Sequence, residues 1–320
     1  MAAVTFGANR AAPVRIGLVL GSGGVLGAAW MTGALVRLGE RLPCPATDAD
    51  LIVGTSAGSV IAAALRCGAS TEEMVAWQYG EADGSLAGPA ALAAQEGPFP
   101  PLPHLLRPGS LPLARAALLR PLRVPPWVGA SAFLPSGRGQ HTALRALVTA
   151  LHPDPGWVTR RTWIAAMDYN TGERVLFGAD GAPTAPLPDA VVASCSIPGW
   201  YAPAVIGGRR YVDGGVRSAT SLGALRGTDV QQVWVLAPMA STEPDHPFQP
   251  HLRLERRVRQ LLTRVLVRQA QALAAEGKQV IVVTPGPREL AVMGANLMDP
   301  RRRRDVLEVS LGTPPLAAAA

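Results

Sequence analysis

The sequence predicts an α/β fold with a largely parallel central sheet. The first observation is that Val14–Leu20 is a short, almost continuous apolar run, which is typical of a strand buried on both faces. A glycine-rich loop and a helical pattern over Val25–Leu38 follow it. A second apolar run, Ala49–Val53, leads through a glycine-containing turn into another helical pattern, Ser59–Arg66. Strands that alternate with helices in this way favour a parallel sheet covered by helices.

The later part of the chain continues with further strands and helices. Strand patterns cover Thr162–Ala166, Glu173–Phe177, Val205–Val212, Val230–Leu236 and Val280–Val283, and helical patterns cover Leu111–Leu119, His141–Leu151, Asp189–Cys195 and Leu252–Ala275, with a last helix ending near Met298. The turn-rich segment between the first two of these strands predicts a hairpin.

The long helix predicted over Leu252–Ala275 is amphipathic. Apolar side chains recur at helical spacing along it, which predicts that they face inward and that the arginines face outward. The side chains expected to face inward are Leu254, Val258, Leu261, Leu262, Val265 and Leu273.

The domain organisation that the sequence predicts is simple. Residues 1–13 are expected to form a flexible tail, and residues 14–320 a single domain, which the elements of residues 221–320 complete. Residues 84–140 are rich in proline, so regular sheet is not expected there. This segment is either an insertion of surface loops or a mobile cover over an apolar pocket, because it also carries several large apolar side chains.

Composition narrows the class of protein and of partner. The chain has 320 residues, of which 48% are hydrophobic and 17% charged, and this balance excludes a disordered protein. The net charge of +7 favours anionic partners. We find no zinc-finger spacing and no interleaving of basic and aromatic residues, so nucleic acid is not expected. Anionic lipid headgroups remain as partners of a basic surface such as Arg301–Arg304 or the arginine face of residues 253–268.

The cysteines point to a reducing compartment. Cys44, Cys67 and Cys195 are odd in number and form no CxxC pair, so neither a disulfide framework nor a zinc site is expected. We expect buried thiols in a cytoplasmic protein, peripheral at the membrane where it meets lipid, with no metal and no cofactor. The sequence does not determine the oligomeric state.

The stretch from Ile16 to Val36 holds no charged residue, and its length would suit a membrane-spanning helix or a signal peptide. Its glycines argue against both, because the run from Gly21 to Gly24 interrupts any helix. We therefore expect a strand, a loop and a helix in this stretch.

Gly54–Gly58 (GTSAG) fits the pattern G-x-S-x-G between a buried strand and a helix. A tight turn from strand to helix needs glycine on both sides of the serine, here Gly54 and Gly58, and it presents the hydroxyl at the helix N-terminus. There the helix dipole stabilises developing negative charge. The pattern predicts that Ser56 is a nucleophile.

A serine nucleophile needs a base, and the histidines are poorly placed to supply one. They are His104, His141, His152, His246 and His251, and none belongs to a recognisable motif. A Ser-His-Asp triad also fits badly because Ser56 follows only two predicted strands, whereas the α/β-hydrolase fold has more sheet before its nucleophile.

A carboxylate is the other candidate base. Asp213 follows a strand pattern and precedes Gly214 and Gly215, which permit close approach of backbone. By itself an Asp-Gly pair can equally be an ordinary turn.

Gly21–Gly27 (GSGGVLG) is a glycine loop that leads into a helix, and backbone N–H groups in such a loop bind anions. The loop suits a tetrahedral oxyanion or a dinucleotide pyrophosphate. The dinucleotide spacing G-x-G-x-x-G fails from Gly21, because Leu26 occupies the third glycine position. Taken alone, the loop leaves both ligands open.

Taken together and in this order, the three motifs resemble the patatin-like phospholipase family. That family has a glycine-rich oxyanion loop after the first strand, a G-x-S-x-G turn and a distant D-G-G/A, which correspond here to Ser22–Gly27, Gly54–Gly58 and Asp213–Gly215. Two further segments resemble the sequence pattern of the family as well: Ala193–Trp200 (ASCSIPGW) and Tyr211–Val216 (YVDGGV). The resemblance covers roughly residues 14–220.

The resemblance implies a lipid acyl-ester hydrolase of phospholipase A or lysophospholipase type, or a transacylase of the same chemistry. It implies a three-layer α/β/α sandwich, a catalytic dyad of Ser56 and Asp213 without histidine, and an oxyanion hole formed by the N–H groups of Gly23 and Gly24. The residues expected to support these motifs are Gly21, Ser22, Gly27, Gly54, Gly58, Gly214 and Gly215.

The chain departs from the family pattern at two places. The family's loop usually reads G-G-G-x-K/R-G, but here Ser22 replaces the first glycine and Leu26 the basic residue. The Asn and Pro that commonly follow D-G-G are also missing, since Arg217–Thr220 stand there. These departures affect the expected substrate more than the expected chemistry. Two other classes stay open: a catalytically silent protein that binds lipid or a membrane surface, and a dinucleotide-dependent enzyme.

Overall fold

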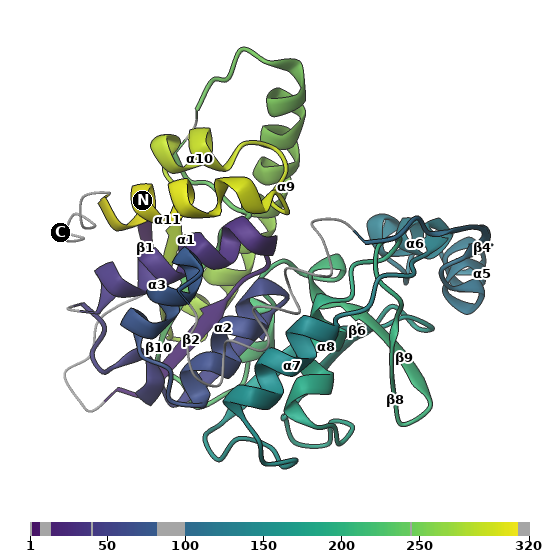
Figure 1. Ribbon diagram of the computed structural model, residues 1–320, viewed down its shortest axis with the longest axis horizontal. Coiled ribbons are helices and arrows are strands. Elements are labelled where there is room, and N and C mark those ends of the chain that lie inside the picture. The colour runs from purple at the N-terminus through teal and green to yellow at the C-terminus, as the bar shows by residue number, and fades with distance from the viewer. Residues whose placement is uncertain (1, 7–13, 40, 82–99, 244, 313–320) are drawn as a thin grey trace. The chain divides into compact units, whose positions relative to one another are not determined.

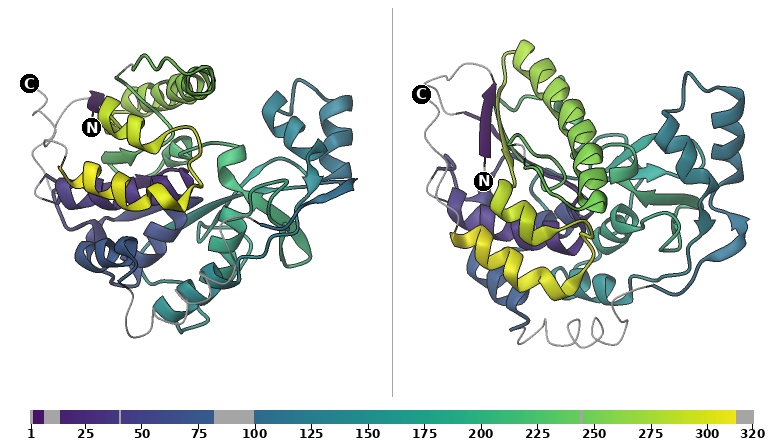
Figure 2. Two further views of the ribbon diagram at one scale, coloured as in Figure 1. Left: turned by 45° about the horizontal axis from the view of Figure 1, so that its top comes forward. Right: turned by 90° about the horizontal axis from the view of Figure 1, so that it is seen from above.

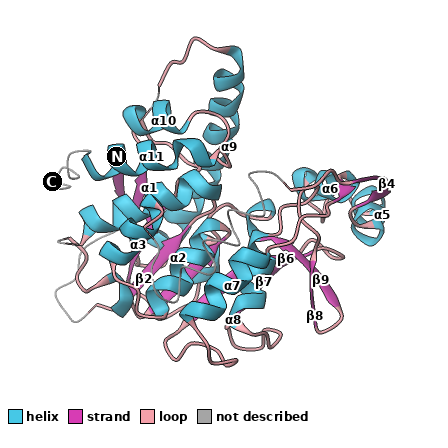
Figure 3. Ribbon diagram, in the orientation of Figure 1, coloured by secondary structure: helices cyan, strands magenta, loops and turns pink. Residues whose placement is uncertain are grey.

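The computed structural model describes residues 2–6, 14–39, 41–81, 100–243 and 245–312. The chain clusters into two compact units. The first unit comprises Met1–Glu81 and Ala219–Ala320, and the second comprises Ala82–Ser218. Figure 1 labels the elements of both, and Figure 3 colours them by type.

The sheet of the first unit confirms the predicted α/β class. Four of its strands are mutually parallel, and a fifth, at the edge, is antiparallel. In spatial order they are β1 (Ala2–Phe6), β11 (Gln279–Thr284), β10 (Gln232–Leu236), β2 (Ile16–Leu20) and β3 (Leu51–Thr55).

The edge strand β1 lies within the predicted N-terminal tail. Ala2–Phe6 pair with β11, so these five residues add a strand to the sheet. Residue 1 and residues 7–13 of the predicted tail lie outside the described residues.

Helices cover this sheet on both faces. Every residue of β2 and of β3 is buried, and successive residues of a strand point to opposite faces, so neither face is open to solvent. The helices of the first unit are visible in the two views of Figure 2. They are α1 (Gly24–Leu38), α2 (Ala57–Arg66), α3 (Thr71–Tyr79), α9 (Pro250–Ala275), α10 (Pro287–Met293) and α11 (Arg303–Gly312).

The uncharged stretch from Ile16 to Val36 forms strand β2, a short loop and most of helix α1. Within the described ranges, no helix is both long and apolar enough to cross a bilayer.

The sequence prediction for helix α9 is wrong for two arginines and for four of the apolar side chains, although Arg253, Arg257, Arg264 and Arg268 are exposed as predicted. Leu254 and Leu261, expected inside, are 64% and 58% exposed, whereas Arg256 and Arg259 are 6% and 2% exposed. Val258 and Val265 are exposed as well, and Leu273 is buried as predicted.

The buried arginines of α9 are stabilised by oxygen atoms from other elements. Arg256 donates to the Asp245 carboxylate at 2.7 Å and to the Leu290 carbonyl at 3.0 Å. Arg259 donates to the carbonyls of Pro238 and Ala240 and to Glu255. Burial is the main effect on the Arg259 guanidinium and lowers its pKa. Because most of these donors bind an oxygen and Arg259 also forms an ion pair with Glu255, arginine can occupy the inner face of this part of the helix.

The second unit is built on antiparallel strands. Strand β6 (Thr162–Asp168) pairs with β7 (Arg174–Phe177), which confirms the predicted hairpin. It also pairs with β9 (Arg209–Asp213), which in turn pairs with β8 (Ala204–Ile206) across the turn at Gly207 and Gly208. Helices α7 (Thr142–Leu151) and α8 (Leu187–Cys195) accompany these strands, as the sequence predicted.

The proline-rich segment is more regular than the sequence suggested. Residues 100–140 form helices α5 (Leu111–Leu119) and α6 (Pro126–Phe133) and a two-stranded sheet of β4 (His104–Pro108) and β5 (Pro135–Ser136). Prolines start these helices rather than break them, because proline is tolerated in the first turn. Residues 84–99 of the segment lie outside the described residues.

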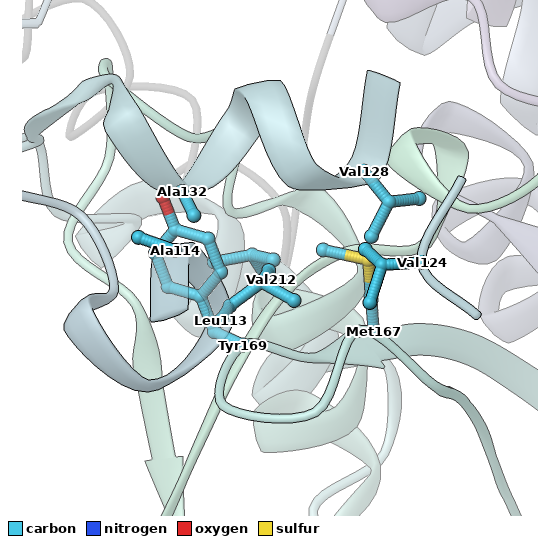
Figure 4. Packing of buried hydrophobic residues seen from close by; sticks show 8 residues of the cluster. All are labelled: Leu113, Ala114, Val124, Val128, Ala132, Met167, Tyr169 and Val212. Carbon is cyan, nitrogen blue, oxygen red and sulfur yellow. The ribbon is translucent and has the colours of Figure 1, made fainter. Parts of the chain in front are cut away.

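The two helices of this segment pack on strands β6 and β9 of the same unit. Figure 4 shows the buried cluster that joins them, in which the Tyr169 ring lies among the aliphatic side chains. Its members are Leu113, Ala114, Val124, Val128, Ala132, Met167, Tyr169 and Val212. The Tyr169 hydroxyl donates to the Ser131 carbonyl at 2.7 Å, which fixes α6 to the sheet.

One histidine of the second unit is expected to make the free energy of unfolding depend on pH. His141 stacks on the Tyr201 ring with centroids 3.7 Å apart, and its Nε2 lies 3.0 Å from the Cys195 carbonyl. Burial lowers the pKa of His141 to about 4. The unfolded chain therefore binds more protons than the folded chain between about pH 6.5 and this lower value.

We expect the free energy of unfolding to decrease as the pH falls through this window, by up to about 3 kcal/mol from His141 alone. Urea unfolding at several pH values measures it. The control is His141→Gln, whose amide can still donate to the Cys195 carbonyl but does not titrate, so its curve should be flatter. Parallel curves for the two proteins would contradict the prediction.

Candidate active site

Ser56 occupies a strained turn between β3 and α2. Its φ of 53° and ψ of −122° lie in a region that non-glycine residues rarely adopt, and helix α2 begins at the next residue. The Ser56 carbonyl accepts two hydrogen bonds from Ser59, from the backbone N–H at 2.7 Å and from the hydroxyl at 2.6 Å. These bonds stabilise the turn, and the local sequence alone does not reveal the part that Ser59 plays.

The two glycines of the motif are required by packing. A Cβ at Gly58 would lie 2.0 Å from the Leu20 carbonyl oxygen, at the end of β2. A Cβ at Gly54 would lie 2.6 Å from the Gly58 carbonyl oxygen and from the Ser59 Cα. Only glycine allows the start of α2 to pass so close to β2 and β3, and this close approach is what forces the turn at Ser56.

The turn at Ser56 is also tied to a segment from much later in the chain. Thr55 is fully buried, and its hydroxyl donates to the Ser221 hydroxyl at 3.3 Å. Ser221 itself has a φ of 54°, and with Ser56 it makes up the described non-glycine residues that have positive φ.

The glycine loop joins β2 to α1 in the same unit. The Gly21 N–H donates to the Leu236 carbonyl at 2.9 Å, and the Ser22 N–H donates to the Ala219 carbonyl at 2.7 Å. Gly24 has a φ of 58°, which favours glycine, and a Cβ there would lie 2.6 Å from Met298 Sδ. The loop is therefore held from both sides by segments of residues 219–236 and 297–298.

The amides at the start of α1 are available for a ligand. The Leu26 N–H donates to the Leu297 carbonyl at 3.0 Å, and the Gly27 N–H donates to the Gly23 carbonyl at 2.8 Å. For the N–H groups of Gly23 and Gly24, no acceptor is found in the described part of the chain. Such unsatisfied N–H groups at a helix N-terminus are suited to a negatively charged oxygen.

Residues that the sequence did not single out hold this loop in place. A Cβ at Gly23 would lie 2.6 Å from Pro238 Cγ, so the Pro238 ring packs against the loop. The buried Arg259 donates in turn to the carbonyl of Pro238. The Leu26 side chain, at the position where the family pattern has a basic residue, is fully buried. A charge at that position would therefore lie in the apolar core.

Asp213 ends strand β9 in the second unit. Its N–H donates to the Ser196 carbonyl at 2.9 Å, and its Oδ1 accepts from the Gly215 N–H at 2.7 Å. Asp213 is 5% exposed, so its carboxylate is largely shielded from water. Gly214 begins a short 3-10 helix, Gly214–Val216, and a Cβ there would lie 2.3 Å from the Ala165 carbonyl oxygen.

The contact between Asp213 and Ser196 gives the segment Ala193–Trp200 a structural role. This segment begins in the last turn of α8, where the Ser194 hydroxyl donates to the Ala165 carbonyl at 2.6 Å. Ser196 binds the backbone of Asp213, and Ala165 packs closely against Gly214. These two contacts hold the turn at the end of β9 in place.

The predicted residues divide between the two units. Ser56 and the glycine loop, from Gly21 to Gly27, belong to the first unit, and Asp213, Gly214 and Gly215 belong to the second. Of the histidines named in the sequence, His141 is packed against Tyr201. Among the described residues, no group of three or more His, Cys, Asp or Glu side chains could hold a metal ion.

All three motifs lie within one region that matches a known family. A family model described as patatin-like phospholipase matches residues 18–226. The chain belongs to the patatin-like phospholipase family. This membership supports a lipid hydrolase, and the match includes the glycine loop, the serine turn and the Asp-Gly-Gly sequence.

Solved structures are also similar to the chain, at low identity. VipD from Legionella pneumophila has a TM-score of 0.41 and 14% identity, over 93% of this chain and 68% of that chain. The type III effector protein ExoU has a TM-score of 0.31 and 14% identity, over 96% of this chain and 61% of that chain. A search of curated proteins found no match.

The close approach of α2 to β2 leads to a test of the serine turn in this patatin-like protein. Gly58→Ala puts a methyl group into the space of the Leu20 carbonyl, so we expect a loss of at least about 2 kcal/mol in the free energy of unfolding. The control is Gly223→Ala, where the nearest atom to the new Cβ would be 3.6 Å away, an ordinary contact. Chemical denaturation of both variants measures the difference, and equal stability would contradict this account of the turn.

Proposed function

We propose that this protein hydrolyses acyl esters of lipids, as a phospholipase A or lysophospholipase, through Ser56 as nucleophile and Asp213 as base. The observation that carries the proposal is the positive φ of Ser56 at the start of helix α2, in a chain that belongs to the patatin-like phospholipase family. A non-glycine residue is held in this strained conformation only where the surrounding structure enforces it, and such strain clusters at active sites.

In the proposed first step, the Ser56 hydroxyl attacks the carbonyl carbon of the ester. Its proton passes to the Asp213 carboxylate, and the carbonyl oxygen becomes an oxyanion. The N–H groups of Gly23 and Gly24 are the proposed donors to this oxyanion, supported by their lack of acceptors within the described residues and by the dipole of α1. Asp213 then protonates the leaving alcohol, and the acyl group remains on Ser56.

In the second step, water attacks the acyl-enzyme while Asp213 accepts its proton. Asp213 then returns this proton to the Ser56 oxygen as the bond to the acyl group breaks and the fatty acid leaves. Asp213 is a weak base by itself, so stabilisation of the oxyanion is expected to supply much of the acceleration. If a second lipid alcohol replaces water, the same intermediate gives acyl transfer. Peripheral contact with anionic membrane is part of the proposal, because the expected substrates are amphipathic.

The proposed nucleophile is tested by covalent labelling. A fluorophosphonate probe should label the parent protein, and Ser56→Ala should abolish the labelling because no other hydroxyl replaces the one on this turn. Ser136→Ala, in strand β5 of the second unit, is the matched control and should keep it. Labelling that persists in Ser56→Ala would overturn the assignment. Binding to lipid vesicles without any acyl release would instead favour a catalytically silent lipid-binding protein.

The proposed base is tested by turnover. Asp213→Asn keeps the size of the side chain and an oxygen that can accept from the Gly215 N–H, but it removes the base. We expect turnover of p-nitrophenyl esters to fall by about a thousandfold. Asp189→Asn, in helix α8, is the control and should keep the parent rate.

Substitution of the histidines distinguishes an aspartate base from a histidine base. His104→Ala, His152→Ala, His246→Ala and His251→Ala should each keep turnover close to that of the parent protein. Loss of turnover in one of them, together with an active Asp213→Asn, would replace the dyad by a histidine-dependent mechanism. Esters of graded chain length, phospholipids and lysophospholipids in the same assay identify the preferred substrate.

A further inference from the structure

Helices α5 and α6 each have a buried face, but they also expose large apolar side chains to solvent. Leu118 and Leu119 of α5 are 71% and 67% exposed, and Leu122 in the following turn is fully exposed. Trp127 and Phe133 of α6 are 57% and 54% exposed. We name the exposed side chains of Leu111, Leu118, Leu119, Leu122, Trp127 and Phe133 the α5–α6 surface.

This surface is not an unfinished part of the core. The opposite faces of the two helices already pack on β6 and β9, with Leu113, Val128 and Tyr169 fully or almost fully buried (Figure 4). The Arg210 guanidinium donates to the Gly109 carbonyl at 2.5 Å and lies 5.4 Å from the centre of the Tyr169 ring, which fixes the entry to α5. The helices are therefore held on one side and present apolar groups on the other.

The segment that carries this surface has charges of one sign. Residues 100–153 contain no Asp and no Glu, but they include Arg115, Arg120 and Arg123, all exposed. None of these three arginines forms an ion pair with another described residue. Leu111, Arg115 and Leu118 share one face of α5, because residues three or four positions apart are neighbours on a helix.

Apolar side chains interleaved with arginine are the pattern of a helix that lies in a membrane interface. Leucine, tryptophan and phenylalanine enter the boundary between headgroups and acyl chains, and arginines bind anionic headgroups. A protein partner would require matching acidic side chains, whereas an anionic bilayer offers negative charge over its whole area. An aromatic ring such as that of Trp127 is favoured at this boundary.

We propose that the α5–α6 surface docks the protein on membranes that contain anionic lipid. The proposal goes beyond the chemistry of Ser56 and Asp213, since it concerns a separate surface and would stand for a silent protein as well. It also differs from the basic surfaces that the sequence suggested, Arg301–Arg304 and the arginine face of residues 253–268.

The test uses the full chain with Ser56→Ala, so that no vesicle lipid is consumed and a failure of the proposed chemistry leaves the result unchanged. Co-sedimentation with vesicles of phosphatidylcholine is compared with vesicles of phosphatidylcholine and phosphatidylglycerol. We expect stronger binding to the anionic vesicles, weakened by salt. Leu118→Ser with Leu122→Ser should weaken this binding by about tenfold or more, and Arg120→Gln with Arg123→Gln should weaken it mainly at low salt.

The matched control is Leu254→Ser with Leu261→Ser on helix α9, which also removes two exposed leucines. It should bind as the parent does. Brominated acyl chains report contact directly: they should quench tryptophan fluorescence of the parent, and Trp127→Phe should remove most of this quenching. Circular dichroism of each variant checks that it is folded. The quenching experiment does not depend on any substitution in α5, so it tests the contact even if the leucine variants unfold.

Three results would overturn the proposal. The first is equal binding by the parent and the α5–α6 variants. The second is loss of binding by the α9 control while the α5–α6 variants still bind. The third is a parent that binds no vesicles and elutes as a dimer, which Leu118→Ser with Leu122→Ser converts to a monomer, because the surface would then join two copies of the chain.

Discussion

The contact between the start of helix α2 and the end of strand β2 is the constraint on which the candidate active site depends. A Cβ at Gly58 would lie 2.0 Å from the Leu20 carbonyl oxygen and 2.9 Å from that of Gly21. This approach requires glycine, imposes a positive φ on Ser56 and brings the serine turn beside the first residue of the glycine loop. One steric condition thus links two motifs that are separate in the sequence.

Residues beyond the matched part of the family model support these motifs. Pro238 packs against Gly23, and the segment of Leu297 and Met298 contacts Gly24 and accepts from Leu26. Arg259 is buried in order to hold the Pro238 carbonyl, which is why arginine occupies the inner face of α9. The last third of the chain is therefore part of what positions the glycine loop.

Arginine serves two opposite purposes in this protein. In α9, Arg256 and Arg259 are buried and bind carboxylates and carbonyls, so their charge is compensated within the fold. Around α5 and α6, Arg120 and Arg123 are exposed among leucines in a stretch without acidic residues. Surface electrostatics of the second kind suit a lipid hydrolase, whose expected substrates are gathered in an interface instead of dissolved in water.

The sequence by itself determined the elements that depend on neighbouring residues. The strands at Ile16–Leu20 and Leu51–Thr55, the helices after them and the need for glycine at Gly54 and Gly58 all follow from local periodicity and turn chemistry. The three motifs also identified the family correctly. The pairing of Ser56 with Asp213 stays a prediction.

Only the tertiary structure decided which faces are buried. Periodicity shows that α9 has an apolar stripe, but it does not show that Arg256 and Arg259 are buried, because they bind carbonyls of Pro238, Ala240 and Leu290. In the same way, pairing with β11 makes a strand of Ala2–Phe6, and packing on Tyr169 orders the proline-rich helices. These outcomes depend on partners far away in the chain, and no local pattern contains them.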